Sequence, residues 1–430
     1  EVQVSPLLPF PPTVSLNGRH VTVSIPDSVL MDNTTYRVSM NNAIKDLREG
    51  NPFPPYTYVF STGSYFDSLQ LGGIVYDAAT GMPDSSSLIL VYSAAKSDSV
   101  VVQEKPLYIG KVTTGGHFEV KGLPGKRFRI YALHDANKNL TYDGGEEMIG
   151  FVDSIVVPTD SIAQPIILKV FKEAMPPDSM QSVSQRPAAG KQRRNRDTEK
   201  DIWSYGVALD TSDINKRTVE IIEPIKITLS RAADTLNPQR VFLSYDSSGV
   251  AVEAAFTLKR DTVKPEQLLL NSNWKEDMVY TLRLLKGFAK DSAGNELMPS
   301  KYIFRTKNDD DYGKLSVNIP VKYKSPEYLF MVTGDADTIY NQQITDTVVR
   351  LIRIKPGNYR LRIIVDKNRN GKWDTGDLFE KRQPENVIPY TDVLQVKAGW
   401  DNTIDFEKLE KGKKSKAANS PGKREQTPDK

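Results

Sequence analysis

The stretch Thr35-Tyr36-Arg37-Val38, followed by Lys45-Asp46, Gly50-Asn51 and Tyr58-Val59-Phe60-Ser61-Thr62, occurs a second time 244 to 245 residues later in the chain. The second copy reads Val279-Tyr280-Thr281-Leu282, Lys290-Asp291, Gly294-Asn295 and Tyr302-Ile303-Phe304-Arg305-Thr306. Short runs of β-branched and aromatic residues, punctuated by Gly and Asn, are typical of strands and turns. A repeat of this length indicates duplicated domains and not a solenoid.

A second repeat follows the first. Gly122-Leu123-Pro124-Gly125 and Asp135 correspond to Ile354-Lys355-Pro356-Gly357 and Asp366, 231 to 232 residues later. The Pro-Gly step predicts a turn between two antiparallel strands. The chain therefore has the order A-B-linker-A′-B′.

The composition supports an all-β protein of about three or four domains. Hydrophobic residues make up 39% of the 430 residues, and convincing helical stripes are few. The chain has no cysteine, which excludes disulfides and cysteine-based metal or nucleophile sites. This suits an exported protein, although a cytosolic origin stays open. No apolar run is long enough to span a membrane, and no signal-like segment is present.

Basic charge is concentrated in two segments that read as disordered, because they are rich in Pro, Ser, Lys and Arg. The segment from Arg186 to Lys200 carries +4 and the segment from Lys408 to Lys430 carries +5, against a net charge of +3 for the whole chain. Contact with anionic lipid is one interpretation, and solvated tails are the other. No aromatic residues are interleaved with these charges, so we expect no nucleic-acid partner.

Two loops carry oxygen-bearing side chains at the spacing of a twelve-residue calcium loop. Side chains at positions 1, 3, 5, 9 and 12 and the backbone carbonyl at position 7 would bind one ion in each loop. The sequence thus predicts two Ca²⁺ ions. The first loop supplies Asp135, Asn137, Asn139, Thr141, Asp143 and Glu146, and the second supplies Asp366, Asn368, Asn370, Lys372, Asp374 and Asp377.

Both loops depart from the pattern. Leu140 stands where a glycine would make the sharp turn, and Asp377 is shorter than the usual closing glutamate. The alternative is that these Asn-rich segments form Asx-turns without a metal. Three carboxylates in each loop would repel one another without a cation, however, and the pattern occurs twice. Alternating runs ending near Ala132 and Val365 precede the loops and predict strands, which excludes an EF-hand pair and favours a bracing role.

The A-type unit resembles the bacterial Ig-like domain of envelope proteins, on the residues of the first repeat. The B-type unit resembles the carboxypeptidase-regulatory or collagen-adhesin B-type module, a transthyretin-like sandwich, on Leu71-Gly72-Gly73-Ile74-Val75-Tyr76-Asp77, Gly116-His117-Phe118-Glu119-Val120 and the Pro-Gly turn. The resemblance implies tandem Ig-like and transthyretin-like β-sandwiches. Such modules specify a fold better than a function.

These boundaries follow: 1–66, the C-terminal part of an Ig-like domain; 67–172, a transthyretin-like sandwich; 173–200, a disordered linker; 201–308, an Ig-like domain; 309–407, a transthyretin-like sandwich; 408–430, a disordered tail. The second Ig-like unit opens with a strand at Ile222–Ser230 that has no equivalent in the first. We expect one or two strands of the first unit to lie upstream of Glu1 or to be supplied otherwise. The alternative is a shorter β-element packed on the next domain.

Catalysis is not expected. The chain has three histidines and lacks the Gly-x-Ser-x-Gly, His-Glu-x-x-His and glycine-rich phosphate-loop motifs. A glycosidase pair of carboxylates stays open, because its members meet only in the fold. The four tryptophans could stack on sugars only if two or more aromatics shared an exposed face.

The order of modules, the loops and the basic tail resemble Bacteroidota-type surface lipoproteins. The resemblance implies an outer-membrane protein facing the cell exterior, held by a lipid anchor upstream of this chain. It further implies an accessory subunit whose partners are barrel and lipoprotein subunits, as in the outer-membrane protein assembly machinery. The alternative function is a surface protein that binds glycans or peptides for nutrient capture.

Overall fold

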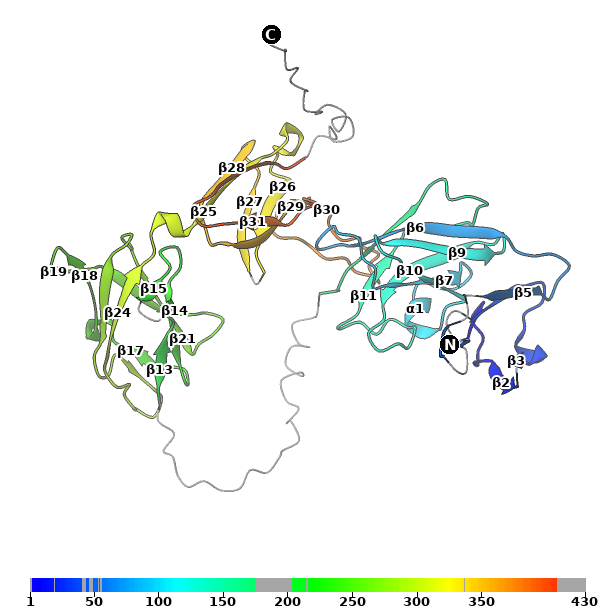
Figure 1. Ribbon diagram of the computed structural model, residues 1–430, viewed down its shortest axis with the longest axis horizontal. Coiled ribbons are helices and arrows are strands. Elements are labelled where there is room, and N and C mark those ends of the chain that lie inside the picture. The colour runs from blue at the N-terminus through cyan, green and yellow to red at the C-terminus, as the bar shows by residue number, and fades with distance from the viewer. Residues whose placement is uncertain are drawn as a thin grey trace, which may run out of the picture. The chain divides into compact units, whose positions relative to one another are not determined.

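The computed structural model describes residues 2–18, 20–40, 44–45, 49–52, 54, 56–174, 203–213, 216–335 and 337–407. Within these ranges the regular secondary structure consists almost entirely of strands in separate sheets, so the predicted all-β class is confirmed (Figure 1). The predicted linker from residue 175 onward and the predicted tail lie outside the described residues. The chain divides into two compact units, 1–186 with 321–345 and 360–393, and 187–320 with 346–359 and 394–430.

The first unit opens with a small sheet and a hairpin. The strands β1 (Gln3–Ser5), β4 (Thr35–Ser39) and β5 (Thr57–Ser61) form an antiparallel sheet in the order β1-β4-β5. The hairpin pairs β2 (Thr13–Asn17) with β3 (His20–Ser24). Among the described residues of this part, the buried core consists of Val4, Leu8, Tyr36 and Val38.

A β-sandwich follows in the same unit (Figure 1). One sheet has the order β11-β10-β7-β8 and the other has the order β12-β6-β9. The alternating pattern of β10 buries Phe128, Ile130 and Ala132 in the core, as a half-buried strand should. The strand bounds are β6 Leu69–Asp77, β7 Leu88–Ser93, β8 Tyr108–Lys111, β9 His117–Leu123, β10 Phe128–His134, β11 Met148–Phe151 and β12 Ile166–Val170.

The opposite face of β10 is also buried, which the sequence pattern did not indicate. Tyr131 and Leu133 pack in a second apolar cluster with the short helix α1 (Val100–Gln103) and with Tyr142 from the loop after β10. Leu378, from the second predicted calcium loop region, belongs to the same cluster. The two predicted loops therefore both contribute to the packing on this face of the first sandwich.

The first unit also contains four strands from the C-terminal half of the chain. The sheet order is β27-β26-β29-β30. Leu329, Met331 and Ile364 form a small core with Trp373 packed against it. The strand bounds are β26 Tyr328–Thr333, β27 Thr338–Gln343, β29 Gly357–Val365, of which residues 360–365 fall in this unit, and β30 Val387–Pro389.

The second unit contains a larger Ig-like sandwich. Its sheets have the orders β13-β16-β21-β20 and β14-β15-β24-β22-β18-β19, with a small β17-β23 pair. Eighteen buried residues form its core, among them Ile227, Leu270, Tyr280 and Phe304. The bounds are β13 Tyr205–Val207, β14 Asp210–Asp213, β15 Lys216–Val219, β16 Ile225–Leu229, β17 Thr235–Leu236, β18 Val241–Ser247, β19 Val250–Glu253, β20 Phe256–Arg260, β21 Gln267–Ser272, β22 Val279–Leu284, β23 Ala289–Lys290 and β24 Ser300–Thr306.

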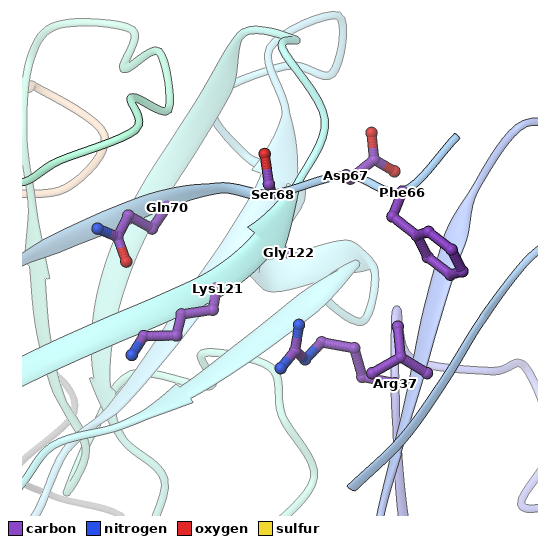
Figure 2. A pocket seen from close by; sticks show the side chains of 8 residues that line it. Arg37, Phe66, Asp67, Ser68, Gln70, Lys121 and Gly122 are labelled. Atoms are coloured by element: carbon purple, nitrogen blue, oxygen red, sulfur yellow. The ribbon is translucent and has the colours of Figure 1, made fainter.

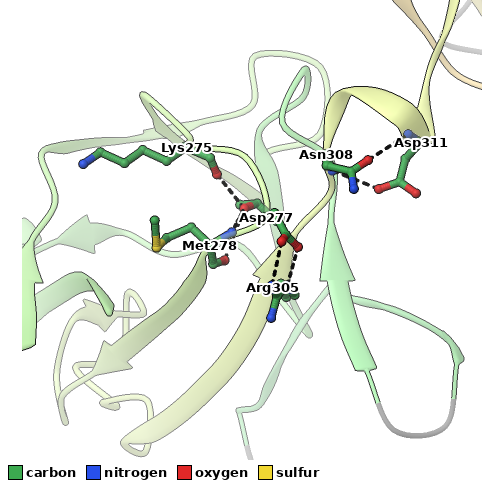
Figure 3. A network of polar contacts seen from close by, with 7 residues as sticks. Lys275, Asp277, Met278, Arg305, Asn308 and Asp311 are labelled. Atoms are coloured by element: carbon green, nitrogen blue, oxygen red, sulfur yellow. Dashed lines mark hydrogen bonds and ion pairs between the residues drawn. The ribbon is translucent and has the colours of Figure 1, made fainter. Parts of the chain in front are cut away.

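Polar contacts fix the end of β24 in this sandwich (Figure 3). The guanidinium of Arg305 pairs with the carboxylate of Asp277, with 2.7 Å between Nη2 and Oδ2. Asn308 and Asp311 then form a capping box at the next turn.

The unit ends with the sheet β28-β25-β32 and with the strand β31. The bounds of these strands are β25 Gly313–Asn318, β28 Val348–Ile354, β31 Leu394–Val396 and β32 Asp401–Asp405.

Candidate metal-binding loops

The first predicted loop begins directly after β10, on Asp135. Both carboxylate oxygens of Asp135 accept backbone N–H groups from across the loop. Oδ1 accepts from Asn139 N at 3.1 Å, and Oδ2 accepts from Leu140 N at 2.9 Å. These bonds draw the backbone around one carboxylate, which brings the predicted ligand positions 1 and 5 and the turn residue at position 6 together.

Two amide side chains converge on Asp143 in this loop. The Nδ2 atoms of Asn137 and Asn139 lie 2.7 and 2.6 Å from Asp143 Oδ2. The amide oxygens accept local N–H groups, and Asn139 Oδ1 accepts from Thr141 N at 2.8 Å. Side chains 3, 5 and 9 of the predicted pattern therefore meet at one point.

The second loop repeats these contacts, residue for residue. Asp366, which is fully buried, accepts from Asn370 N at 3.1 Å and from Gly371 N at 2.8 Å. Asn368 Nδ2 and Asn370 Nδ2 lie 2.5 and 2.8 Å from Asp374 Oδ2. At position 7, Lys372 N donates to the amide oxygen of Asn370 at 2.8 Å. Two loops of different sequence thus share one geometry.

The backbone of the two loops is also shared. Lys138 and Leu140 have φ values of 63° and 66°, and the corresponding Arg369 and Gly371 have values of 59° and 76°. The left-handed conformation at position 6 is free for glycine but costs about 1–2 kcal/mol for a leucine. Leu140 therefore makes the turn that the sequence pattern assigns to glycine, under strain.

Glu147 closes the first loop. Its carboxylate is buried, with only 4% of the residue exposed. Oε1 accepts from Ala136 N at 3.2 Å, and Oε2 accepts from Asp143 N at 3.0 Å. The predicted ligand Glu146 instead points to solvent, with 81% of its side chain exposed, and pairs with Lys172 at 2.7 Å.

Glu385 has the same role in the second loop. Its oxygens accept from Lys367 N and Asp374 N, both at 3.1 Å. These are the equivalents of the two donors to Glu147. Burial raises the pKa of Glu385, and the nearby Asp374 and Asp366 raise it further, against the lowering effect of the two backbone hydrogen bonds. A bound cation would offset the repulsion among these three carboxylates.

Asp377, the predicted closing residue, lies in a turn of its own. Its backbone pairs with that of Arg382 in both directions, and its Oδ1 accepts from Glu380 N at 2.8 Å. Sequence reasoning thus missed Glu147 and Glu385. A twelve-residue pattern could not identify Glu385, because this residue lies well beyond the end of the pattern in the sequence.

Both loops are anchored by the aromatic residue at position 8. Tyr142 is buried, its N–H donates to Val101 O at 2.9 Å, and its hydroxyl donates to Glu173 Oε2 at 2.7 Å. Burial, and then the bond to Glu173, raise the pKa of the Tyr142 hydroxyl. In the second loop, Trp373 Nε1 donates to Glu385 O at 3.1 Å. Each anchor ties its loop to the surrounding packing.

A seam joins the second loop region to the first sandwich within the first compact unit. Leu378, only 5% exposed, sits in the apolar cluster on the outer face of β10. Its N–H donates to Glu173 Oε1 at 2.6 Å, and Thr375 Oγ1 donates to Lys172 O at 2.6 Å. Glu173 therefore contacts the anchor of the first loop with one oxygen and the second loop region with the other.

The donor set suits a hard cation. The side chains that meet in the loops are carboxylates and amides, and carboxylate and amide oxygens are ligands that calcium prefers. Asparagine presents either oxygen or nitrogen by a half turn of its amide. Within the described ranges, no three His, Cys, Asp or Glu side chains form a ready metal cluster. Amide and backbone oxygens would therefore have to supply part of the coordination in either loop.

The remaining sequence candidates are dispersed. The histidines His20, His117 and His134 are exposed and lie on separate strands. Of the four tryptophans, only Trp400 is mainly exposed, at 56%. Its ring lies 4.6 Å from Lys397 Nζ. No tryptophan pair therefore forms a sugar-stacking platform.

A pocket of about 400 Å³ lies beside β4 and β9 in the first unit (Figure 2). Its charged side chains are Arg37, Asp67 and Lys121. Asp67 is tied to the sheet, because its N–H donates to Thr35 Oγ1 at 2.7 Å and its Oδ2 accepts from Thr35 N at 3.2 Å. With one carboxylate, the pocket does not contain a glycosidase pair.

Among the described residues no helix has the length and apolar character to cross a membrane.

No curated protein matches the chain. Among solved structures, the N-terminal part of the bacterial S-layer protein SbsC is 12% identical with a TM-score of 0.22 over 44% of each chain, so this chain spans less than half of that fragment. BcpA, the major pilin subunit of Bacillus cereus, is 9% identical with a TM-score of 0.18 over 79% of this chain and 99% of that one. Residues 3–62 match the family model of the bacterial Ig-like domain, which confirms the Ig-like part of the sequence interpretation.

Proposed function

We propose that this protein is a non-catalytic, calcium-braced structural and interaction protein. The observation that carries the proposal is the identical set of contacts in the two loops. In each loop, one Asp, two Asn, a second Asp and a closing Glu meet in the same way. An Asx-turn caps backbone only about two residues further on, so it does not account for the closing glutamate, which is Glu147 directly after the first loop and the more distant Glu385 in the second.

Calcium would supply the positive charge between these oxygens, and the chain would supply their placement. Asp135 and Asp366 hold the backbone of the loops, and Glu147 and Glu385 close them. Because the second loop region carries Leu378 into the cluster of the first sandwich, fixing this loop fixes the seam. Calcium would then set the geometry between modules and perform no chemistry.

The cellular setting is proposed from the sequence resemblance. We place the protein at the outer-membrane surface, held by a lipid anchor, as an accessory subunit of a complex such as the outer-membrane protein assembly machinery. Its partners would be barrel and lipoprotein subunits. Sites of extracellular-module affinity, with Kd on the order of 0.1–1 mM, would be filled at millimolar external calcium.

Calcium titration of the full chain by calorimetry tests the proposal. We expect two sites in the wild type and one site in each of Glu147→Gln and Glu385→Gln. At about 10 mM calcium, each site should add about 1.4–2.7 kcal/mol to the free energy of unfolding. The matched controls are Glu146→Gln and Asp377→Asn, which should keep both sites. Absence of calcium binding in the wild type would refute calcium bracing, and loss of a site in a control would refute the assignment of the closing residues.

A further inference from the structure

The segment of chain that leaves β12 contacts both candidate calcium loops. It consists of Phe171, Lys172 and Glu173, and we call it the strap. Phe171 is 1% exposed and packs in the apolar cluster on the outer face of β10. Its backbone pairs with that of Ile149 in both directions, at 2.9 Å. The strap is therefore held to the first sandwich where it begins, and its next two residues reach the loops from a fixed point.

The strap contacts the first loop through two side chains. Glu173 Oε2 accepts from the Tyr142 hydroxyl at 2.7 Å, and Lys172 Nζ lies 2.7 Å from Glu146 Oε2. Tyr142 directly precedes Asp143, whose carboxylate receives both asparagine amides and whose N–H donates to the closing glutamate. The position of the Tyr142 ring therefore affects backbone groups that shape the first loop.

The strap contacts the second loop region through its other polar groups. Glu173 Oε1 accepts from Leu378 N at 2.6 Å, and Lys172 O accepts from Thr375 Oγ1 at 2.6 Å. Both partners lie in residues 375–384, which we call the docked segment and which connect the second loop to its closing glutamate. One carboxylate, that of Glu173, is thus divided between the two loops.

The docked segment fits closely against its surroundings. A Cβ added to Gly376 would lie 2.5 Å from Cζ of Phe171, so only glycine fits there without a shift of the strap. Lys381 forms an ion pair with Asp98, shortly before α1. The helix α1 in turn accepts a hydrogen bond from the backbone N–H of Tyr142. The segment is therefore either seated in all of these contacts or displaced from them, because close packing does not yield gradually.

An ion in either loop favours the seated position. Calcium in the second loop would hold Asp374 and Glu385, the residues on either side of the docked segment, close together, which reduces the conformations open to that segment. Calcium in the first loop would fix Asp143 and with it the neighbouring Tyr142, which donates to Glu173. Two ligands that favour the same state of a protein increase each other's affinity by the same factor.

We propose that the two candidate calcium loops bind calcium with positive cooperativity, and that Glu173 is the positioning residue that couples them. The proposal rests on the proposed function, because it requires an ion in each loop. When one loop is filled, Glu173 and the docked segment are already placed for the other. Couplings between two sites typically change an affinity by about 5-fold to 150-fold.

Calcium titration by calorimetry measures the coupling. Glu385→Gln leaves only the first loop able to fill, and Glu147→Gln leaves only the second. For independent loops, the wild-type isotherm equals the sum of these two isotherms. We expect the wild type to bind its second calcium at least about 5-fold more tightly than that sum allows. A purely structural contact would change stability and leave the sum intact.

Variants of the strap contacts identify the coupling residue. Glu173→Ala, compared with the same single-loop variants made in its own background, should bring the isotherm back to the sum. Tyr142→Phe keeps the ring, removes the hydroxyl that donates to Glu173, and should weaken the coupling in the same direction. The matched control is Glu119→Ala, which removes an exposed carboxylate of β9 that pairs with Lys121, and it should keep the cooperativity.

Hydrogen exchange follows the coupling by a readout other than affinity. In Glu385→Gln, calcium fills the first loop alone. The amides of Asp377 and Arg382 bond to each other's carbonyls within the docked segment, so their exchange reports its order without a direct bond to Glu173. We expect calcium to slow their exchange in Glu385→Gln and to leave it unchanged when Glu173→Ala is added. The amides of β24 serve as the internal reference.

The outcomes separate the two proposals. Two independent sites in the wild type, or cooperativity that survives both Glu173→Ala and Tyr142→Phe, would overturn the coupling and leave the proposed function standing. Exchange in the docked segment that does not respond to calcium in the first loop would also overturn the coupling. Absence of calcium binding in the wild type would refute both proposals together.

Discussion

Glu385 combines burial with two neighbouring carboxylates, and its protonation should therefore report whether a cation is present. Burial first, and then Asp374 and Asp366, raise its pKa above the ordinary value of 4.5. A carboxyl group with a raised pKa in the folded state stabilises the fold below its ordinary pKa. That contribution is lost as the pH rises through the raised value. In chelator, the protein should thus lose stability as the pH rises from about 4.5 toward neutrality.

The measurement is the thermal midpoint against pH, in chelator and in calcium. Calcium should flatten the decline, because a bound cation favours the charged carboxylate. Glu385→Gln should flatten it in chelator as well. Glu380→Gln is the control, because the Glu380 side chain is 70% exposed and should leave the decline intact. A decline of equal slope in wild type and Glu385→Gln would contradict this account.

At the same scale, the spacing in the sequence named most of the side chains that meet in each candidate loop and did not name the glutamate that closes it. Positions 1, 3, 5 and 9 follow from local spacing, since they lie on one tight loop. Glu147 stands one residue after the predicted Glu146, and only the fold distinguishes the buried member of this pair from the exposed one. Glu385 reaches the second loop from beyond an extra segment that includes Leu378 and has no counterpart between Asp143 and Glu147 in the first loop. A pattern of fixed length cannot cover such an insertion.

At the scale of elements, the loop segment around Leu378 is a structural part of the first sandwich. Leu378→Ala removes a buried side chain from the cluster that contains Tyr131 and Tyr142. We expect a loss of about 2–5 kcal/mol in the free energy of unfolding. Urea unfolding, followed by tryptophan fluorescence, measures this loss. The neighbouring Phe379→Ala is the matched control and should change stability by less than about 0.5 kcal/mol, because Phe379 is 65% exposed.

A loss below about 0.5 kcal/mol in Leu378→Ala would mean that the contacts of Leu378 with the first sandwich do not contribute to folding.

The alternation of apolar and polar residues predicted β10 and β29 as strands, because its period is that of a pleated surface. It could not predict that the outer face of β10 is covered as well. The covering groups, α1, Tyr142 and Leu378, come from three separate stretches of sequence, and their meeting depends on tertiary packing.

At the scale of the whole molecule, the sequence repeat predicted duplicated modules, and the common register of β4–β5 and β22–β24 agrees with the duplication. The repeat could not predict that the strands of the second B-type module are divided between the two compact units. The sheet with β26 and β29 belongs to the first compact unit, together with the first sandwich. Both candidate calcium loops therefore lie in one compact unit, and their occupation should affect that unit as a whole.

Partner binding should then depend on calcium through both loops. The accessory-subunit proposal predicts that tagged full-length protein, purified from the envelope of its native cells in calcium, carries barrel and lipoprotein subunits that mass spectrometry identifies. These subunits should be lost in chelator, and the double variant Glu147→Gln with Glu385→Gln should lose them even in calcium. The double variant Glu146→Gln with Asp377→Asn keeps the same change in charge and should retain them. A protein that purifies alone in both conditions would exclude the accessory-subunit role, and partners that persist in chelator would exclude calcium as the brace of the complex.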